Sequence, residues 1–341
     1  MEDGGGSAAE EWGLLMEISN VNYTDKLNSI FFGYFEDRYQ TFLKSNNDFV
    51  HYTSLANLHN ILQKKQIWLR NVSCMNDFME VHQGIKLFRE AFTRNDRVLL
   101  KRLLGVLQEI NETDWEACIN NILYVNSGYF LFHTYIVCLS EHDTSVDISE
   151  DDGSLAMWRA YGRSSGGAIV FDKHKLAAFD ISPLCFSPVA YFRKKETYSE
   201  LEKYISSFID NIEREKEFLK TCPAWMVKNC LEQAIIYAIV SIKHSGFAEE
   251  KEWRLIYIEP DAFSPKLMTC CKENVGDTPQ RVYKLNIEEV LKNAVSRVLI
   301  GATQYGFAAR DVVVDDLRQI LNIDRTEVEK LVHNTRIPLR P

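Results

Sequence analysis

Two short stretches of the sequence gather residue types that bind anions and stabilise charge. The first, SLAMWRAYGRSSGGAIVFD, spans residues 154–172, and the second, FAEEKEWRLIY, spans residues 247–257. Alternate side chains of an extended strand share a side, so Glu250, Glu252 and Arg254 should form one row of charges. Arginine binds carboxylates and phosphates through paired N–H donors, and a carboxylate can stabilise a cation. Such a row is a candidate functional site, and on an exposed strand it is also ordinary solvated surface.

The first stretch predicts a short helix, a tight turn and a buried strand. Ser154 suits the N-cap position, and Trp158 and Tyr161 recur at helical spacing, which leaves Arg159 on another side. Glycines close the turn, and the apolar run 168–171 is typical of a buried strand. Trp158 and Tyr161 suit a packed core as well as a binding site, so their role depends on the residues beside them.

A histidine lies early in the chain on a predicted strand. The run FVHYT at residues 49–53 indicates a strand that enters a helix at Ser54, with the helix continuing over residues 55–64. His51 is therefore expected on a strand at the edge of the core. The run YFLFHTYIVCLS at residues 129–140 predicts a central strand, whose histidine should be satisfied in the core.

Acidic residues stand at two further places. A helical tract opens at Asn76, Asp77 and Glu80 and should reach about residue 110. The spacing of Asp77 and Glu80 fits a capping box, which satisfies two backbone amides without any chemistry. Residues 141–153 carry six acidic residues and no lysine or arginine. This segment predicts a solvated loop, mobile enough to lie over a cleft.

Composition limits the possible partners and cofactors. The chain has 341 residues, 48 acidic and 39 basic, and its formal net charge of -9 provides no positive field to hold nucleic acid nonspecifically. The eight cysteines form no CxxC pair and have no zinc-ligand spacing, so no metal is predicted and reduced thiols are expected. The N-terminus lacks the features of a signal peptide, and no apolar run is long enough to span a bilayer. We therefore expect a cytoplasmic protein with no membrane partner.

The pattern of expected elements predicts an α+β fold with a mixed, mostly antiparallel central sheet and flanking helices. Residues 1–23 are expected to be a flexible segment, residues 24–48 a helical extension, and residues 49–341 a single domain with a helical insertion at 196–245. Further strands are expected at 67–69, 185–192, 281–285 and 296–300, and further helices at 287–291, 307–320 and 327–332.

Five motifs in a fixed order carry a resemblance to a known family. They are HYTS from His51, the ND of residues 76–77 with Glu80, CLSE at residues 138–141, SLAMWRAYG from Ser154, and FAEEKEWRLIY from Phe247. Together they resemble the domain-of-unknown-function family 2971, a large bacterial family, over roughly residues 51–340. Their joint order is far more specific than any one of them. The family itself supplies no reaction.

A more distant resemblance supplies chemistry. ADP-ribosyltransferases of the His-Tyr-Glu type hold NAD with a histidine on an early strand, stack nicotinamide on an aromatic ring and place a glutamate on a later strand. His51, Tyr161 and Glu252 are similar to these three residues. Loss of nicotinamide leaves a cation-like ribose, which a fixed carboxylate stabilises, while a histidine orients the ribose. The resemblance implies NAD as substrate and catalytic roles for all three side chains.

Other residues join the site by the same resemblance. Tyr52 and Thr53 flank the histidine, and Arg159 or Arg254 is implied to hold the pyrophosphate through paired N–H donors. Trp158, Glu250 and the group Asn76, Asp77 and Glu80 are further candidates. The acceptor of ADP-ribose, a protein or a nucleic acid, stays open, and a role as a bacterial defence or toxin effector rests on analogy.

Three alternatives stay open from the residues alone. A nuclease or other hydrolase would use histidine and carboxylates for proton transfer or metal binding, with the set His51, Asp77, Glu80 and Glu252. A non-catalytic module would bind a nucleotide with the same arginines and aromatic rings. A purely structural role would pair Arg159 and Arg254 with Glu80, Glu250 or Glu252 in a buried network.

Overall fold

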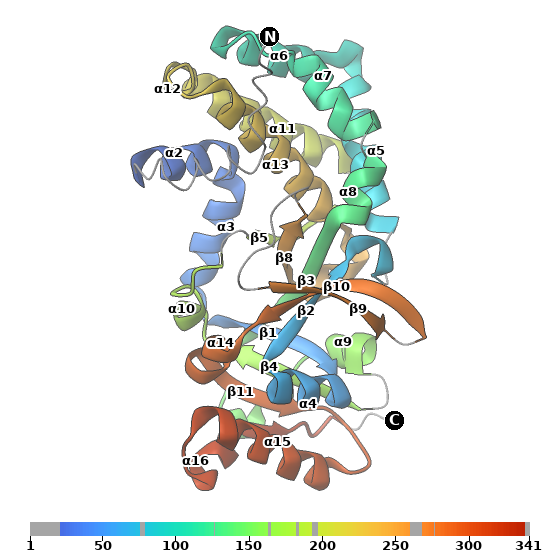
Figure 1. Cartoon of the computed structure of the whole chain (residues 1–341), viewed down its shortest axis with the longest axis vertical. Coiled ribbons are helices and arrows are strands. Elements are labelled where there is room, and N and C mark those ends of the chain that lie inside the picture. The colour runs from blue at the N-terminus through green and yellow to red at the C-terminus, as the bar shows by residue number, and fades with distance from the viewer. Residues whose placement is uncertain are drawn as a thin grey trace, which may run out of the picture.

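The computed structural model describes residues 21–75, 79–125, 127–162, 165–181, 184–192, 197–259, 268–275 and 277–337. Helices gather at one end of an elongated molecule, and a sheet covered by helices forms the other end (Figure 1). The sheet is mixed and mostly antiparallel, which confirms the predicted α+β class. In the described residues no helix has both the length and the apolar character needed to cross a bilayer.

The large sheet has ten strands in the described part of the chain. Its strand order is β12-β11-β4-β1-β3-β2-β10-β9, with β8 paired to β3 and β5 paired to β8. Only β11 and β12 run parallel among these pairs. The strands are β1 (Asn47–Ser54), β2 (Gln66–Asn71), β3 (Thr134–Asp143), β4 (Gly166–Phe171), β5 (Cys185–Pro188), β8 (Glu252–Ile258), β9 (Met268–Val275), β10 (Thr278–Asn286), β11 (Val295–Ile300) and β12 (Val332–Asn334).

Strand β3 is central, and its two edges differ. Along one edge it pairs with β8 from Thr134 to Ser140. The other edge is shared, because β1 pairs with residues 140–143 and β2 pairs with Tyr135 and Ile136. The sheet therefore splits beside residues 137–139 of β3, between the ends of β1 and β2.

Helices cover both ends of the molecule (Figure 1). Those of the helical end are α2 (Val21–Phe31), α5 (Met79–Thr93), α6 (Val98–Ile110), α7 (Trp115–Asn120), α8 (Ser127–His133), α11 (Thr197–Arg214), α12 (Lys216–Leu219) and α13 (Ala224–Val240). Helix α3 (Gly33–Leu43) leads from α2 to the sheet, where α4 (Leu55–Lys64), α10 (Lys173–Leu176), α14 (Glu288–Ala294), α15 (Gly306–Leu321) and α16 (Arg325–Glu329) lie. Helices α11, α12 and α13 occupy most of the segment 196–245 that was predicted to be helical.

Local signals predicted helix α4 correctly. The side chain of Ser54 accepts a hydrogen bond from the backbone N–H of Asn57 at 3.2 Å, as an N-cap should. Leu58, Ile61 and Leu62 are buried on one side of the helix. The helical extension predicted over residues 24–48 holds two helices, because the backbone leaves the helical region at Phe32.

The strand predicted at residues 129–140 is half helix. Helix α8 ends at His133 and β3 begins at Thr134. The rings of Tyr129 and His133 stack 3.8 Å apart, and the Tyr129 carbonyl lies 2.8 Å from His133 Nδ1, which a helical turn allows and a strand does not. His133 is accordingly half-buried, so the prediction of a core histidine was wrong.

Two other predicted elements have different bounds in the structure. The expected strand at 185–192 is two strands in different sheets, because β5 pairs with β8 while β6 (Ala190–Phe192) pairs with β7 (Ile242–His244) in a two-stranded sheet. The expected helix at 327–332 ends at Glu329, and β12 follows. All eight cysteines are free thiols, as expected from their spacing.

Much of the acidic segment 141–153 is exposed, as predicted, but the segment is anchored to the sheet at Asp151. His142 and Asp151 are buried, and Asp151 Oδ2 lies 2.8 Å from His142 Nε2 and 2.9 Å from Arg297 Nη1. Arg297 also donates to the carbonyls of Thr144 and Val146. Burial would raise the pKa of Asp151, but the bonds to His142 and Arg297 lower it overall. The burial and pairing of Asp151 were not predicted, because its partner Arg297 lies on β11, far along the chain.

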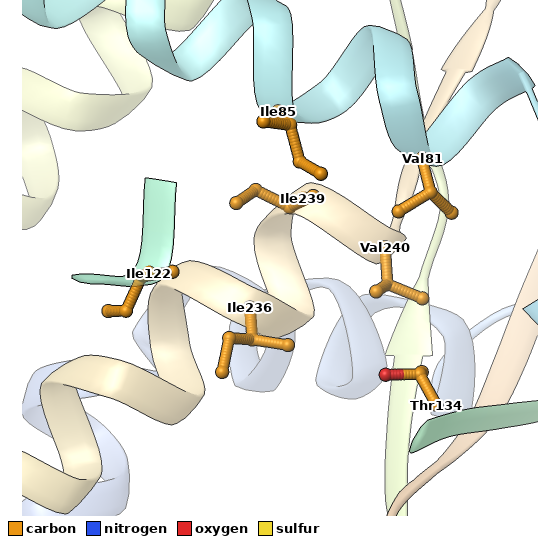
Figure 2. Close-up of a pocket in the computed structure, with 7 residues that line it drawn as sticks. All are labelled: Val81, Ile85, Ile122, Thr134, Ile236, Ile239 and Val240. Carbon is orange, nitrogen blue, oxygen red and sulfur yellow. The ribbon is translucent and has the colours of Figure 1, made fainter. Parts of the chain in front are cut away.

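A small cavity lies in the core between α5, α13 and the start of β3 (Figure 2). Its volume is about 10 Å³, close to the space of one water molecule. Thr134 is its single polar lining residue, beside Val81, Ile85, Ile122, Ile236, Ile239 and Val240. The Thr134 hydroxyl is buried and has no hydrogen-bond partner among the described residues.

Replacing Thr134 with valine should leave stability unchanged or raise it by about 1 kcal/mol, because it removes a buried hydroxyl without a partner. Ser187→Ala is the contrast, since the Ser187 hydroxyl is buried and lies 2.7 Å from the Ser241 hydroxyl. The Ser187→Ala change should lower the free energy of unfolding by about 1 kcal/mol. Urea unfolding of both variants measures the difference, and a Thr134→Val variant less stable than Ser187→Ala would contradict the prediction.

Candidate functional site

The stretch SLAMWRAYG forms a short α-helix followed by a turn of π-helix. Helix α9 covers only Leu155–Met157, and the wider turn η5 covers Trp158–Gly162. Ser154 makes no side-chain cap; its backbone N–H donates to the Tyr52 hydroxyl at 2.9 Å. Because π-turns occur frequently at functional sites, this local departure from the predicted helix directs attention to the side chains that η5 carries.

Trp158 anchors this turn in the core. It is 2% exposed, and its Nε1–H donates to the carbonyl of Asp152 at 2.8 Å. A Cβ at Gly166 would lie 2.7 Å from the indole ring, and one at Gly301 would lie 3.0 Å from it. Trp158 is therefore a packing residue that fixes η5 against β4, and it presents Tyr161 toward the start of β8.

Four charged side chains form a buried cluster at the start of β8. Lys243 Nζ lies 2.9 Å from Glu250 Oε2 and 2.9 Å from Glu252 Oε2, and Arg254 Nε lies 2.7 Å from Glu252 Oε1. The side chains of Lys243, Glu252 and Arg254 are 3 to 4% exposed and that of Glu250 is 11% exposed. The predicted row of charges does come together, but it is buried and neutralised by Lys243 rather than solvated.

Backbone geometry makes this grouping possible. Glu250 ends the 3-10 segment η6 (Ser245–Glu250), and Lys251 adopts a left-handed conformation with φ of 43° before β8 begins. The chain thus turns between the two glutamates instead of running extended as predicted. Strand β7 supplies Lys243 from the neighbouring small sheet.

Two tyrosines border the cluster. The Tyr161 hydroxyl donates to Glu250 Oε2 at 3.3 Å, and the Tyr191 hydroxyl accepts the backbone N–H of Glu252 at 2.7 Å. Burial, and then the nearby acidic groups, raise the pKa of Tyr161 far above its ordinary value. Tyr161 therefore remains a protonated donor toward Glu250.

Glu252 is an ionised carboxylate. Burial alone would raise its pKa, but Arg254 and Lys243 outweigh that effect and lower the pKa to about 2. The thiol of Cys138 also hydrogen-bonds to Glu252, and burial together with this carboxylate raises the thiol pKa well above its usual value. Cys138 is thus an inert donor in the cluster, not a nucleophile.

His51 lies at the split in the sheet. Its Nδ1 is 3.0 Å from the backbone carbonyl of Cys138, so Nδ1 carries the proton. Burial lowers the pKa of His51, which favours the neutral ring and leaves Nε2 as an acceptor. Val50 and Tyr52 pack with Trp158, so alternation along β1 places His51 on the opposite face of the strand. His51 is therefore linked to the charged cluster through Cys138 rather than by direct contact.

The remaining predicted residues differ in position. The Thr53 hydroxyl accepts from the Asn57 side chain at 3.2 Å, and Tyr52 supports Ser154 as described above. Arg159 is exposed, and no ion pair in the described part of the chain includes it. Asn76, Asp77 and the side chain of Glu80 lie outside the described residues. Among the residues described, no group of three or more His, Cys, Asp or Glu side chains could hold a metal ion.

Sequence reasoning missed Lys243 and Tyr191. The signal for Lys243 was a lone lysine in the apolar run AIIYAIVSIKH, because a lysine buried there requires a carboxylate partner. Tyr191 carried no comparable signal, since its contact is with the backbone of a strand far along the chain.

Residues 157–255 match the model of a family described as Protein of unknown function (DUF2971). This segment contains η5, β7 and the start of β8, and therefore all four side chains of the charged cluster. No curated protein and no solved structure matches the chain. The resemblance predicted from the order of the sequence motifs is confirmed over residues 157–255, where the chain matches the model of this family of proteins of unknown function.

Proposed function

We propose that this protein uses NAD as a substrate and transfers ADP-ribose to an acceptor or to water. The observation that supports the proposal most directly is the contact of the Tyr161 hydroxyl with Glu250, beside the ionised Glu252. An aromatic ring on which nicotinamide can stack, next to a carboxylate that can stabilise positive charge, suits nicotinamide cleavage. The two residues come from segments 89 positions apart, so the fold is what brings them together.

The reaction breaks the bond between the nicotinamide nitrogen and C1′ of the ribose. The electron pair leaves with nicotinamide, and a hydroxyl, a nitrogen group or water attacks C1′ and then loses a proton. Positive charge develops on the ribose in the transition state, where an ionised carboxylate in a site of low water content stabilises it. Arg254 and Lys243 keep the pKa of Glu252 low, so this carboxylate is ionised.

His51 and Arg159 would bind the rest of the substrate. The neutral His51 ring offers Nε2 as an acceptor for a ribose hydroxyl. This role requires the nucleotide to lie at the split beside residues 137–139 of β3. Arg254 is already paired with Glu252 and donates to the Val240 carbonyl, so the exposed Arg159 is the better candidate for the pyrophosphate.

The setting and the acceptor are part of the proposal. Eight free thiols suit a cytoplasmic protein, where NAD is available. The acceptor is a protein or a nucleic acid, in the manner of a bacterial defence or toxin effector. The position of the transferred label identifies its class.

The test is incubation of the purified full chain with labelled NAD, following nicotinamide release and label transfer. The double variant Glu250→Gln and Glu252→Gln should lose at least about 100-fold in rate, because it removes the transition-state charge. Glu249→Gln is the matched control, since Glu249 is an exposed neighbour in the same motif, and it should keep the wild-type rate. Circular dichroism checks that each variant is folded.

Two results would discard the proposal. One is a wild-type protein that neither binds NAD nor releases nicotinamide. The other is turnover that survives loss of both carboxylates. Either result would leave the hydrolase and the nucleotide-binding module as the functions to test, with nucleotides and nucleic acids as probes.

A further inference from the structure

We infer that Glu250 is the carboxylate that contacts the substrate, and that Lys243 is the positioning residue that holds it in place. This inference rests on the proposed function and divides its chemistry between the two glutamates. The sequence resemblance pointed to Glu252, and it gave no role to Lys243.

The two carboxylates have different surroundings. Each oxygen of Glu252 is bonded to a cation, Oε1 to Arg254 Nε at 2.7 Å and Oε2 to Lys243 Nζ at 2.9 Å. Arg254 Nη2 also lies 3.4 Å from Oε2, and the Cys138 thiol adds a further hydrogen bond. The side chain of Glu252 is 3% exposed. Glu252 is therefore the more deeply buried of the two carboxylates and is held by two cations.

Glu250 lies on the outer side of the cluster. Its side chain is 11% exposed, and it accepts a hydrogen bond from the hydroxyl of Tyr161, which is half-buried. Phe247, three residues earlier, is 39% exposed and its ring lies 4.8 Å from Lys243 Nζ. A planar group that packs on Tyr161 would therefore meet Glu250 before it meets Glu252.

Lys243 connects the two carboxylates. Its ammonium lies 2.9 Å from both of them, with the Phe247 ring on a further side. Two carboxylates this close would repel each other, and a cation shared between them offsets that repulsion. Lys243 thus fixes the position of Glu250 relative to Glu252, which Arg254 ties to the sheet.

Four single variants of the full chain separate these roles: Glu250→Gln, Glu252→Gln, Lys243→Met and Lys243→Arg. Glu250→Gln should lower kcat for nicotinamide release at least about 100-fold while the protein stays folded, with a small loss of Tm from its ion pair with Lys243. Glu252→Gln should lower the Tm more than Glu250→Gln does, because it leaves Arg254 buried without its carboxylate. The inference is overturned if Glu252→Gln is inactive with a wild-type Tm while Glu250→Gln remains active.

The lysine variants test positioning. Lys243→Met should lower kcat with a smaller change in KM, and Lys243→Arg should recover part of kcat, because a cation is restored between the carboxylates. Lys251→Met is the control, since Lys251 is an exposed lysine between the same glutamates, and it should not change kcat. Equal loss of kcat in Lys243→Met and Lys243→Arg at wild-type Tm would overturn the positioning role.

A further measurement does not depend on turnover. Lys243→Met and Glu250→Gln should have non-additive effects on the Tm, because both remove the same ion pair. A wild-type protein without NAD turnover would refute the proposed function and, with it, the substrate contact of Glu250. The Lys243 to Glu250 coupling would then be judged alone, and additive effects would refute it.

Discussion

Replacing Arg254 with methionine should lower the free energy of unfolding by about 3 to 5 kcal/mol, because it leaves a buried carboxylate without one of its two cations. The Arg254 side chain is 4% exposed, and its guanidinium binds Glu252 and the backbone carbonyl of Val240. Methionine fills similar space but donates nothing to either group. Lys243 alone would remain for two glutamates.

The stability lost in the Arg254→Met variant should depend on pH, because it involves the ionised form of Glu252. The pKa of Glu252 is lowered from 4.5 to about 2, so its contribution to stability is present above pH 4.5 and disappears as the pH falls toward 2. The difference between wild type and Arg254→Met should therefore be largest near neutral pH and shrink in acid. Urea unfolding from pH 3 to pH 8 measures it. Arg159→Met, which removes an exposed arginine, should change stability by less than about 0.5 kcal/mol, and an equal loss in both variants would contradict the prediction.

Replacing Trp158 with alanine should lower the free energy of unfolding by about 3 to 5 kcal/mol, because it removes a buried indole ring and leaves a cavity that the neighbouring glycines cannot fill. The ring packs against Gly166 and Gly301 and stands edge-on to Tyr52, with ring centroids 4.8 Å apart. Loss of the ring also leaves the Asp152 carbonyl without its indole donor. Because Trp158 begins η5, the variant should also displace Tyr161 from Glu250.

The matched control is Phe307→Ala, since Phe307 is 89% exposed and its loss should change the Tm by little. Thermal unfolding followed by circular dichroism compares the two variants. A Trp158→Ala protein with the Tm of the Phe307→Ala protein would mean that the indole does not stabilise this part of the core.

Helix α4 and strand β4 could be predicted from the sequence because their signals are local. Ser54 caps α4 within three residues, and the apolar residues of α4 repeat at helical spacing. The run 168–171 is buried as predicted, inside β4. Such elements are determined by residues that are close together along the chain, and a sequence pattern shows those residues directly.

The charged cluster could be predicted only in part. The motif indicated that Glu250, Glu252 and Arg254 belong together, but an alternating pattern does not show whether a strand face meets water or another element. The three charged side chains are buried together with Lys243, and Lys243 comes from β7, a strand of the other sheet. The same limit explains the errors at His133, where an apolar run suited helix and strand equally, and at Asp151, whose partner Arg297 lies 146 residues away.

The central pairing of β3 with β8 has a consequence for synthesis of the chain. Partners in this pair lie more than a hundred residues apart, from Ser140 with Glu252 to Thr134 with Ile258. During translation at roughly 5 to 20 residues per second, one edge of β3 stays unpaired for on the order of ten seconds before β8 is synthesised. The waiting strand is apolar and β-branched, the kind of segment that aggregates when its edge is open. Folding of this protein is therefore governed by its latest central contact, and chaperones that shield an open strand should act between synthesis of β3 and synthesis of β8.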